Sequence, residues 1–174
     1  MIETIRSVLD RTRSRHTPKA PVAIAPLIQE ALSLVSTRSG SRGLAVGING
    51  LPADLPPVPG DAIGLRQVLL NLLNNAIDAT EPPGAVTVGA AVVGEDAPGG
   101  RQLEIRVTDT GRGMGPDEVR RVFEPFYTTK APGRGTGLGL SIVDHIVRAH
   151  GGRVVVESRL GLGTTMRLRL PLEE

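Results

Sequence analysis

The chain contains no cysteine and very few aromatic residues. Cysteine and tryptophan are absent from its 174 residues, and aromatics make up only 2% of them. Without cysteine the chain can form neither a disulfide framework nor a thiolate metal site, which fits a reducing compartment. The core must therefore be aliphatic, and a hydrophobic share of 40% is enough for one domain of this length.

The sequence also lacks a secretory signal, a long apolar run and a strong net charge. No charged start followed by an apolar stretch opens the chain, and no apolar run approaches the ~20 residues of a membrane-spanning helix. We therefore expect a cytoplasmic domain without membrane contact of its own, although a longer parent protein could carry membrane segments. A net charge of only +2 predicts no nucleic-acid partner.

Lysine is rare as well. Only Lys19 and Lys130 occur, against a combined lysine and arginine count of 20. Lys130 lies in the stretch FYTTK. An ammonium group is a compact charge, whereas a guanidinium group is a planar fork. The choice of lysine in that stretch hints that a compact charge is useful there.

Hydrophobic periodicity predicts alternating helices and strands after residue 18. Residues 1–16 have the pattern of the end of an amphipathic helix, which the prolines of HTPKAP terminate. Helices are expected at 25–36, 61–80, 116–123 and 139–150, and strands at 43–48, 85–93, 101–109, 153–159 and 164–172. Residues 51–60 are expected to be a proline-rich connector. We predict one domain over 19–174, an α+β or mixed α/β layer with helices on one face of a sheet of about five strands.

A polar stripe runs along the expected helix at 61–80. Asn71, Asn75 and Asp78 follow the spacing i, i+4, i+7, which places them within about 60° of one another. Amide oxygens suit a hard cation that also holds phosphates and waters. A hydrated polar face would have the same spacing, so the stripe alone does not distinguish a binding site from a solvated surface.

Glycines follow the strand expected at 101–109. Asp109 ends that strand, and Gly111 and Gly113 come directly after it. A carboxylate at a strand end can accept a hydrogen bond from an exocyclic amine, and glycine lets a flat ring approach the backbone. An ordinary turn is the more common explanation of a single G-x-G.

Two further stretches suggest ligand contacts. FEPFYTTK holds both phenylalanines and the single tyrosine, which fits either an aromatic clasp or local packing. Gly135, Gly137 and Gly139 precede an apolar helix whose first amides lack intrahelical partners and can bind phosphate. Thr164 adds a hydroxyl in GLGTT, where a tight turn is the simpler explanation.

Taken in order, NLLNNAIDAT, DTGRGM, FEPFYTTK, GTGLGLSIV and GLGTT resemble the motifs of the catalytic, ATP-binding domain of sensor histidine kinases. The resemblance covers about residues 20–172, and NAIDAT with FEPFYTTK is similar to the nitrogen-regulation and oxygen-sensing branch. It implies a two-layer α/β sandwich with about three helices on one face of a mixed five-stranded sheet. Gyrase-type and heat-shock-chaperone ATPases share this fold.

The resemblance also implies roles for the matched positions. Asn75 would coordinate the Mg²⁺ that bridges the phosphates, supported by Asn71, and Lys130 would reach the outer phosphates. Asp109 would hold the adenine amine, helped by water and Thr164, and residues from about 114 to 136 would form a lid. The full set expected to bind ATP is Asn71, Asn75, Asp78, Asp109, Gly111, Gly113, Lys130, Gly135, Thr136, Gly137, Leu138, Gly139, Leu140 and Thr164.

One position bears on the reaction. Asn71 stands where the hydrolysing relatives carry a glutamate that activates water. An amide cannot accept a proton from water at neutral pH, so hydrolysis should be poorly catalysed. Transfer to a neutral imidazole needs only positioning and charge neutralisation, which favours a histidine kinase over an ATPase. A nucleotide-gated interaction module that binds ATP without phosphotransfer would carry the same binding residues and remains an alternative.

The acceptor histidine of such kinases lies on a helix of a dimeric bundle, usually before an acidic residue. His16 precedes Thr-Pro, and His145 and His150 lie in and at the end of the last expected helix, where surface or helix C-terminal roles are expected. We therefore expect a catalytic domain without its own acceptor, with residues 1–18 as a remnant of the dimerisation helix and linker. Its partners would be a histidine-bearing dimerisation domain, in the same parent protein or in trans, and the receiver domain of a response regulator.

Overall fold

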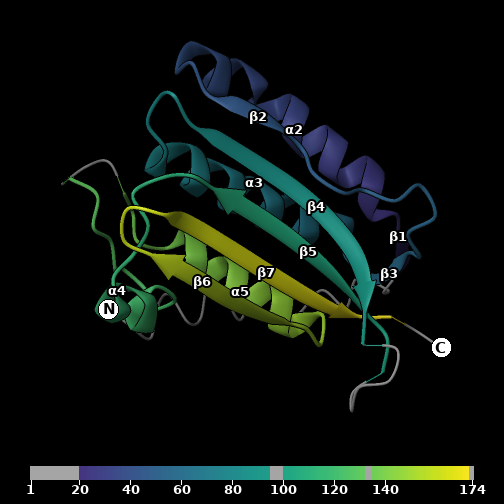
Figure 1. Ribbon diagram of the computed structural model, residues 1–174. Coiled ribbons are helices and arrows are strands. Elements are labelled where there is room, and N and C mark those ends of the chain that lie inside the picture. Colours follow the sequence, from purple (N-terminus) through teal and green to yellow (C-terminus); the bar gives the residue numbers. More distant parts are fainter. Residues whose placement is uncertain (1–19, 95–99, 132–134, 173–174) are drawn as a thin grey trace.

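The computed structural model describes residues 20–94, 100–131 and 135–172 (Figure 1). The helix remnant predicted for residues 1–18 lies outside this part of the chain. Within it, no helix is both long and apolar enough to cross a membrane.

Across the described residues, five strands form one mixed sheet in the spatial order β2-β4-β5-β7-β6. They are β2 (Ala45–Ile48), β4 (Ala85–Val93), β5 (Gln102–Asp109), β6 (Arg153–Arg159) and β7 (Gly163–Pro171). β2 runs parallel to β4, and the other neighbouring pairs are antiparallel. The predicted sheet and its strands are confirmed.

Helices cover one face of this sheet, as Figure 1 shows for α2 (Ile24–Ser41), α3 (Ala62–Ala79) and α5 (Gly139–Ala149). The short helix α4 (Pro116–Arg121) lies apart, on the connection between β5 and α5. The predicted α+β two-layer sandwich is therefore confirmed. α2 continues to Ser41, beyond the expected end at residue 36.

The core between the two layers is aliphatic. Its largest fully buried side chains are isoleucine, leucine and valine, among them Ile77, Leu103 and Leu168. The apolar face of α3 is buried as well, with Leu69 and Leu73 each only 1% exposed. Because a fully buried aliphatic side chain contributes roughly 1.5–3 kcal/mol, this face fixes which side of α3 turns toward the core.

The ends of α3 are set by side-chain hydrogen bonds. Asp61 caps the first turn, with Oδ1 accepting from the Ile63 N–H at 3.0 Å and Oδ2 from the Gly64 N–H at 3.2 Å. At the other end, Thr80 donates its hydroxyl to the Ala76 carbonyl at 2.7 Å. These caps fix the helix register and therefore the direction of its polar stripe.

A second, two-stranded sheet was not predicted. β1 (Ala20–Val22) pairs antiparallel with β3 (Val58–Gly60). β3 lies inside the segment 51–60, which was expected to be only a connector. Pro21 faces Pro59 in this pair, and prolines are confined to edge or very short strands because they cannot donate to the ladder. The proline-rich composition therefore concealed the strand.

Of the two roles expected for His150, the helix C-terminal position is found and the surface position is not. It caps the end of α5 but is only 7% exposed, and its Nε2 accepts a hydrogen bond from the Asp61 N–H at 2.9 Å. Its Nδ1 lies 2.8 Å from the Ile146 carbonyl oxygen, to which it donates. The ring joins the end of α5 to the start of α3, and its burial disfavours a role as phosphoryl acceptor.

Candidate functional site

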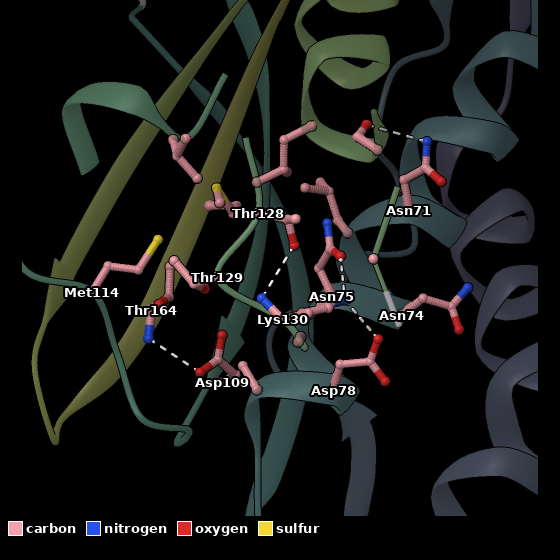
Figure 2. A pocket seen from close by; sticks show the side chains of 18 of the residues that line it. Asn71, Asn74, Asn75, Asp78, Asp109, Met114, Thr128, Thr129, Lys130 and Thr164 are labelled. Carbon is pink, nitrogen blue, oxygen red and sulfur yellow. Dashed lines mark hydrogen bonds and ion pairs between the residues drawn. The ribbon is translucent and has the colours of Figure 1, made fainter. Parts of the chain in front are cut away.

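A cavity of about 360 Å³ lies between α3, the ends of β5 and β7, the segment 112–130 and the start of α5 (Figure 2). This volume is within the ordinary range of small-ligand sites. The predicted site residues that line it are Asn71, Asn75, Asp78, Asp109, Gly113, Lys130, Gly135, Thr136, Gly137, Gly139, Leu140 and Thr164. Of the predicted set, Gly111 and Leu138 do not line it. The structure thus brings together residues from four distant stretches of sequence.

The polar stripe of α3 forms one wall of this cavity. Asn71, Asn75 and Asp78 are partly buried rather than fully solvated. Asn71 Nδ2 donates to the Gly139 carbonyl oxygen at 3.4 Å, so it joins α3 to the first residue of α5. The alternative of a plain hydrated helix face therefore does not describe this stripe.

Lys130 reaches across the cavity to the same wall. Its Nζ donates to Asp78 Oδ2 at 2.7 Å and to Asn75 Oδ1 at 3.2 Å. Figure 2 shows the Lys130 ammonium beside these two side chains. Two oxygens from one helix therefore converge on a single positive charge.

Asp78 is also approached from α2. Arg38 forms hydrogen bonds to Asp78 and Asn74, and Arg42 Nη1 lies 3.6 Å from Asp78 Oδ1. The carboxylate is thus held between Arg38 and Arg42 on one side and Lys130 on the other. It belongs to a network that ties α2, α3 and the segment before α5 together.

Asp109 lies at the opposite end of the cavity and is only 7% exposed. Its Oδ1 accepts from the backbone N–H of Gly111 at 2.8 Å and of Thr164 at 3.2 Å. Among the described residues, none donates to its second oxygen, Oδ2. Burial raises the pKa of Asp109 above its ordinary value, although the two backbone hydrogen bonds act in the opposite direction. A buried acceptor is therefore available to a donor inside the cavity.

The glycines after Asp109 permit close packing of the backbone. At Gly113, with φ +66°, an added Cβ would lie 1.9 Å from the Arg159 carbonyl oxygen. At Gly111 it would lie 2.3 Å from the Ala79 carbonyl oxygen. Gly113 lines the cavity and Gly111 supports it from behind by donating to Asp109.

Gly137, just before α5, also permits close packing of the backbone. Gly137 has φ +67°, and an added Cβ would lie 2.3 Å from the backbone carbon of Phe126. The Phe126 N–H donates to the Gly137 carbonyl at 2.9 Å. Two stretches of irregular backbone, at Phe126 and at Gly137, therefore lie against each other, which only glycine allows here.

The aromatic cluster is divided between packing and the cavity. Phe123 packs against the core, whereas Phe126 is 52% exposed. Tyr127 lines the cavity, and the Arg121 guanidinium lies 4.4 Å from its ring centre. Local packing explains Phe123, and of the three aromatics only Tyr127 reaches the cavity wall.

Several cavity residues were not predicted. Near Asp109 the wall is apolar, formed by Ala79, Val107, Met114 and Met166. Val107 and Met166 lie two residues from Asp109 and Thr164 on the same strands, so strand alternation could have identified them. Arg112 was also missed; it donates to Thr129 Oγ1 at 2.5 Å and to Glu118 Oε1 at 3.0 Å.

Oxygen ligands for a divalent ion are limited on this surface. The described residues contain no group of three or more histidines, cysteines, aspartates or glutamates suited to a metal. Asn75 and Asp78 supply two oxygens, so an ion here would need further oxygens from its ligand and from water. A metal held jointly with a phosphate ligand fits this donor set.

Comparison with known proteins gives consistent matches. The family described as "Histidine kinase-, DNA gyrase B-, and HSP90-like ATPase" matches residues 60–174. Sensor histidine kinase ZraS of Escherichia coli (strain K12) is 37% identical over 168 residues, which is 97% of this chain and 34% of that protein. The chain therefore spans about a third of the length of this curated relative.

Solved structures agree. The mycobacterial sensor histidine kinase MprB has a TM-score of 0.74 at 32% identity, over 88% of this chain and 97% of the solved chain. Full-length ShkA in complex with AMPPNP has a TM-score of 0.76 at 36% identity, over 87% of this chain and 30% of the solved one.

Proposed function

This chain belongs to the histidine kinase-, DNA gyrase B- and HSP90-like ATPase family, and from that premise we propose that it transfers the γ-phosphoryl group of ATP to a histidine of a separate domain. It corresponds to the catalytic ATP-binding domain of a two-component sensor histidine kinase. One observation supports the proposal most strongly. A single cavity has a buried carboxylate, Asp109, at one end and the oxygens of Asn75 and Asp78 at the other.

Asp109 is proposed to bind adenine. Its Oδ1 is occupied by backbone N–H groups and its Oδ2 can accept from the exocyclic amine. The apolar wall of Val107, Met114 and Met166 would contact the faces of the ring. That ShkA is solved in complex with AMPPNP, an adenine nucleotide analogue, agrees with this assignment.

Mg²⁺ is proposed to bind at Asn75, with Asn71 and Asp78 nearby. The residues present fit a bound cation, because the side-chain oxygens of Asn75 and Asp78 on α3 already converge on one, the Lys130 ammonium. The ion would supply charge neutralisation to the phosphates. Lys130 and the start of α5, at Gly139 and Leu140, would hold the outer phosphates.

The identity of residue 71 favours transfer over hydrolysis. Asn71 donates its amide to the Gly139 carbonyl and has no basic group that could accept a proton from water. A neutral imidazole needs no such base, because it presents its own lone pair. The chain would therefore position the γ-phosphoryl group and leave the nucleophile to its partner.

The partners are proposed from the family. They are a histidine-bearing dimerisation domain, in the parent protein or in trans, and the receiver domain of a response regulator. NAIDAT and FEPFYTTK support the nitrogen-regulation and oxygen-sensing branch. We assign the catalytic domain to residues 19–174 and residues 1–18 to the connection with the dimerisation helix.

Incubation of the protein with γ-labelled ATP, Mg²⁺ and the dimerisation bundle of its parent protein tests the proposal. Label on the bundle is the expected result. The control variant Arg120→Ala, which is altered outside the cavity, should label the bundle to the same extent. Nucleotide binding without label would favour the nucleotide-gated module instead. Rapid phosphate release without a bundle would indicate an ATPase.

A further inference from the structure

Lys130 holds the position that the proposed function assigns to a bound cation. Its Nζ lies 2.7 Å from Asp78 Oδ2 and 3.2 Å from Asn75 Oδ1. A Mg²⁺ ion coordinated by Asn75 Oδ1 would lie close to this ammonium, and the two positive charges would repel each other. Binding of a magnesium nucleotide therefore has to displace Lys130 from Asn75.

The displacement is feasible because the carboxylate left behind keeps other partners. Arg38 of α2 bonds Asp78, and Arg42, the residue that follows α2, lies 3.6 Å from it. These arginines balance the charge of Asp78 after Lys130 leaves. They also fix the Asp78 side chain, since Arg38 holds the neighbouring Asn74 too.

The displaced ammonium needs a replacement anion. Lys130 is 34% and Asp78 21% exposed at the side chain, so their ion pair is only partly solvated and its loss carries a cost. A nucleoside triphosphate offers an additional phosphoryl group at the end of the cavity farthest from Asp109. A diphosphate lacks that group, and the ammonium is left without an equivalent partner.

We propose, resting on the function proposed above, that Lys130 makes this domain discriminate nucleoside triphosphate from diphosphate. In the unloaded state it is paired with Asp78 and Asn75, and only a triphosphate compensates its displacement. After transfer of the γ-phosphoryl group, the return of Lys130 to Asp78 favours release of the diphosphate product. Lys130 is then a specificity-determining residue as well as a phosphate contact.

Calorimetric titration of Lys130→Met with Mg·ADP and Mg·AMPPNP tests this role. Methionine keeps the length of the side chain but has no charge. We expect affinity for Mg·AMPPNP to fall about tenfold, and affinity for Mg·ADP to stay constant or rise up to about fivefold. Arg120→Met removes a positive charge from α4 outside the cavity and should change neither affinity.

A second variant distinguishes the effect of the Lys130–Asp78 ion pair on nucleotide affinity from the effect of the contact between Lys130 and phosphate. Asp78→Asn removes the ion pair and also a carboxylate beside the proposed ion, so its effect is measured as a difference between backgrounds. Relative to its effect in the Lys130→Met background, Asp78→Asn should favour Mg·ADP binding about two- to fivefold when Lys130 is present. Equal effects in both backgrounds would overturn the proposal. So would a fall in Mg·ADP affinity in Lys130→Met, because Lys130 would then bind the diphosphate directly. If the unmodified protein bound neither nucleotide, the proposed function itself would fail.

Discussion

At the scale of single residues, the two carboxylate oxygens of Asp109 have different roles. Oδ1 is held by two backbone N–H groups, and Oδ2 is available to the cavity. Burial raises its pKa, so folding disfavours the ionised form of this carboxyl relative to the unfolded chain. A buried charge that weakens the unloaded fold is typical of a residue retained for binding.

The substitution Asp109→Asn tests these different roles of the two oxygens. The amide can still accept the two backbone hydrogen bonds at one end, but its N–H₂ would face the donor amine of adenine. We expect ATP binding to weaken by about 1–3 kcal/mol, while the ligand-free protein becomes at least as stable at pH 7. Calorimetry and thermal unfolding measure the two effects. Unchanged affinity would mean that adenine binds elsewhere.

The pH dependence of the same residue has a defined sign. With a folded pKa above the ordinary 3.8, the contribution of Asp109 to stability is fully present below 3.8 and is lost as pH rises through the folded value. Binding behaves in the opposite way, since the ionised oxygen is the better acceptor. ATP affinity should therefore fall as pH drops through the folded pKa. Titrations from pH 7 downward should show this loss, and Asp109→Asn should abolish it.

Asn75 is the residue on which metal binding depends. Asn75→Ala removes the amide oxygen that now faces Lys130 and should reduce phosphotransfer to background. Asn49→Ala, at an exposed position after β2 that does not line the cavity, removes the same kind of side chain and should retain most activity. Labelling of the dimerisation bundle compares the two. Near-normal transfer by Asn75→Ala would refute its assigned role.

At the scale of elements, α3 connects the core to the site. Its leucines are buried in the core, and its polar stripe faces the cavity, so the start of the helix sets the position of every side chain on it. Asp61 fixes that start through two backbone N–H groups. The His150 contact to the Asp61 backbone N–H adds a link to α5.

Removal of this cap should weaken the whole domain. Asp61→Ala leaves the backbone contact with His150 in place but removes both cap hydrogen bonds. We expect the free energy of unfolding in urea to fall by about 0.5–2 kcal/mol. Asp54→Ala, at an exposed position of the connector, serves as control and should change it by less than ~0.5 kcal/mol. Equal stability of the two variants would argue against the cap.

Regular elements were predictable because each depends on a local pattern. β4 and β6 begin and end at the predicted residues, since alternating apolar positions bounded by turn residues define them. The β1–β3 pair was missed because it joins two short proline-containing segments far apart in sequence. Likewise, motifs identified twelve of the residues that line the cavity, whereas the pairing of Lys130 with Asp78 depends on tertiary contact and has no sequence signal.

At the scale of the whole molecule, the helices of the described residues cover only one face of the sheet. The other face carries Glu104 on β5 between arginines of β7. Burial alone would raise the pKa of Glu104, but hydrogen bonds from Arg169 and Arg167 outweigh it and lower the pKa below the ordinary 4.5. Its contribution to stability is therefore present above 4.5 and is lost as pH falls through the folded value.

Glu104→Gln should accordingly destabilise the fold. The residue is 4% exposed, and loss of its charge weakens hydrogen bonds from two arginines at 3.0 and 2.8 Å. We expect a loss of about 1–3 kcal/mol at pH 7, which shrinks as the pH falls below 4.5. Glu157→Gln, at an exposed neighbour of Arg167, is the matched control and should cost less than ~1 kcal/mol. Urea unfolding at several pH values compares them, and equal losses would contradict a special role for Glu104.

The central claim is that segments far apart in the sequence enclose one magnesium-bound adenine nucleotide. A crystal structure of the protein with Mn²⁺ and AMPPNP tests this most directly, because anomalous scattering locates the ion independently of the nucleotide. We predict an anomalous peak beside Asn75 Oδ1, adenine against Asp109, and Lys130 displaced from Asn75. Nucleotide and ion found outside the cavity between α3, β5 and α5, despite saturating binding in solution, would contradict the claim.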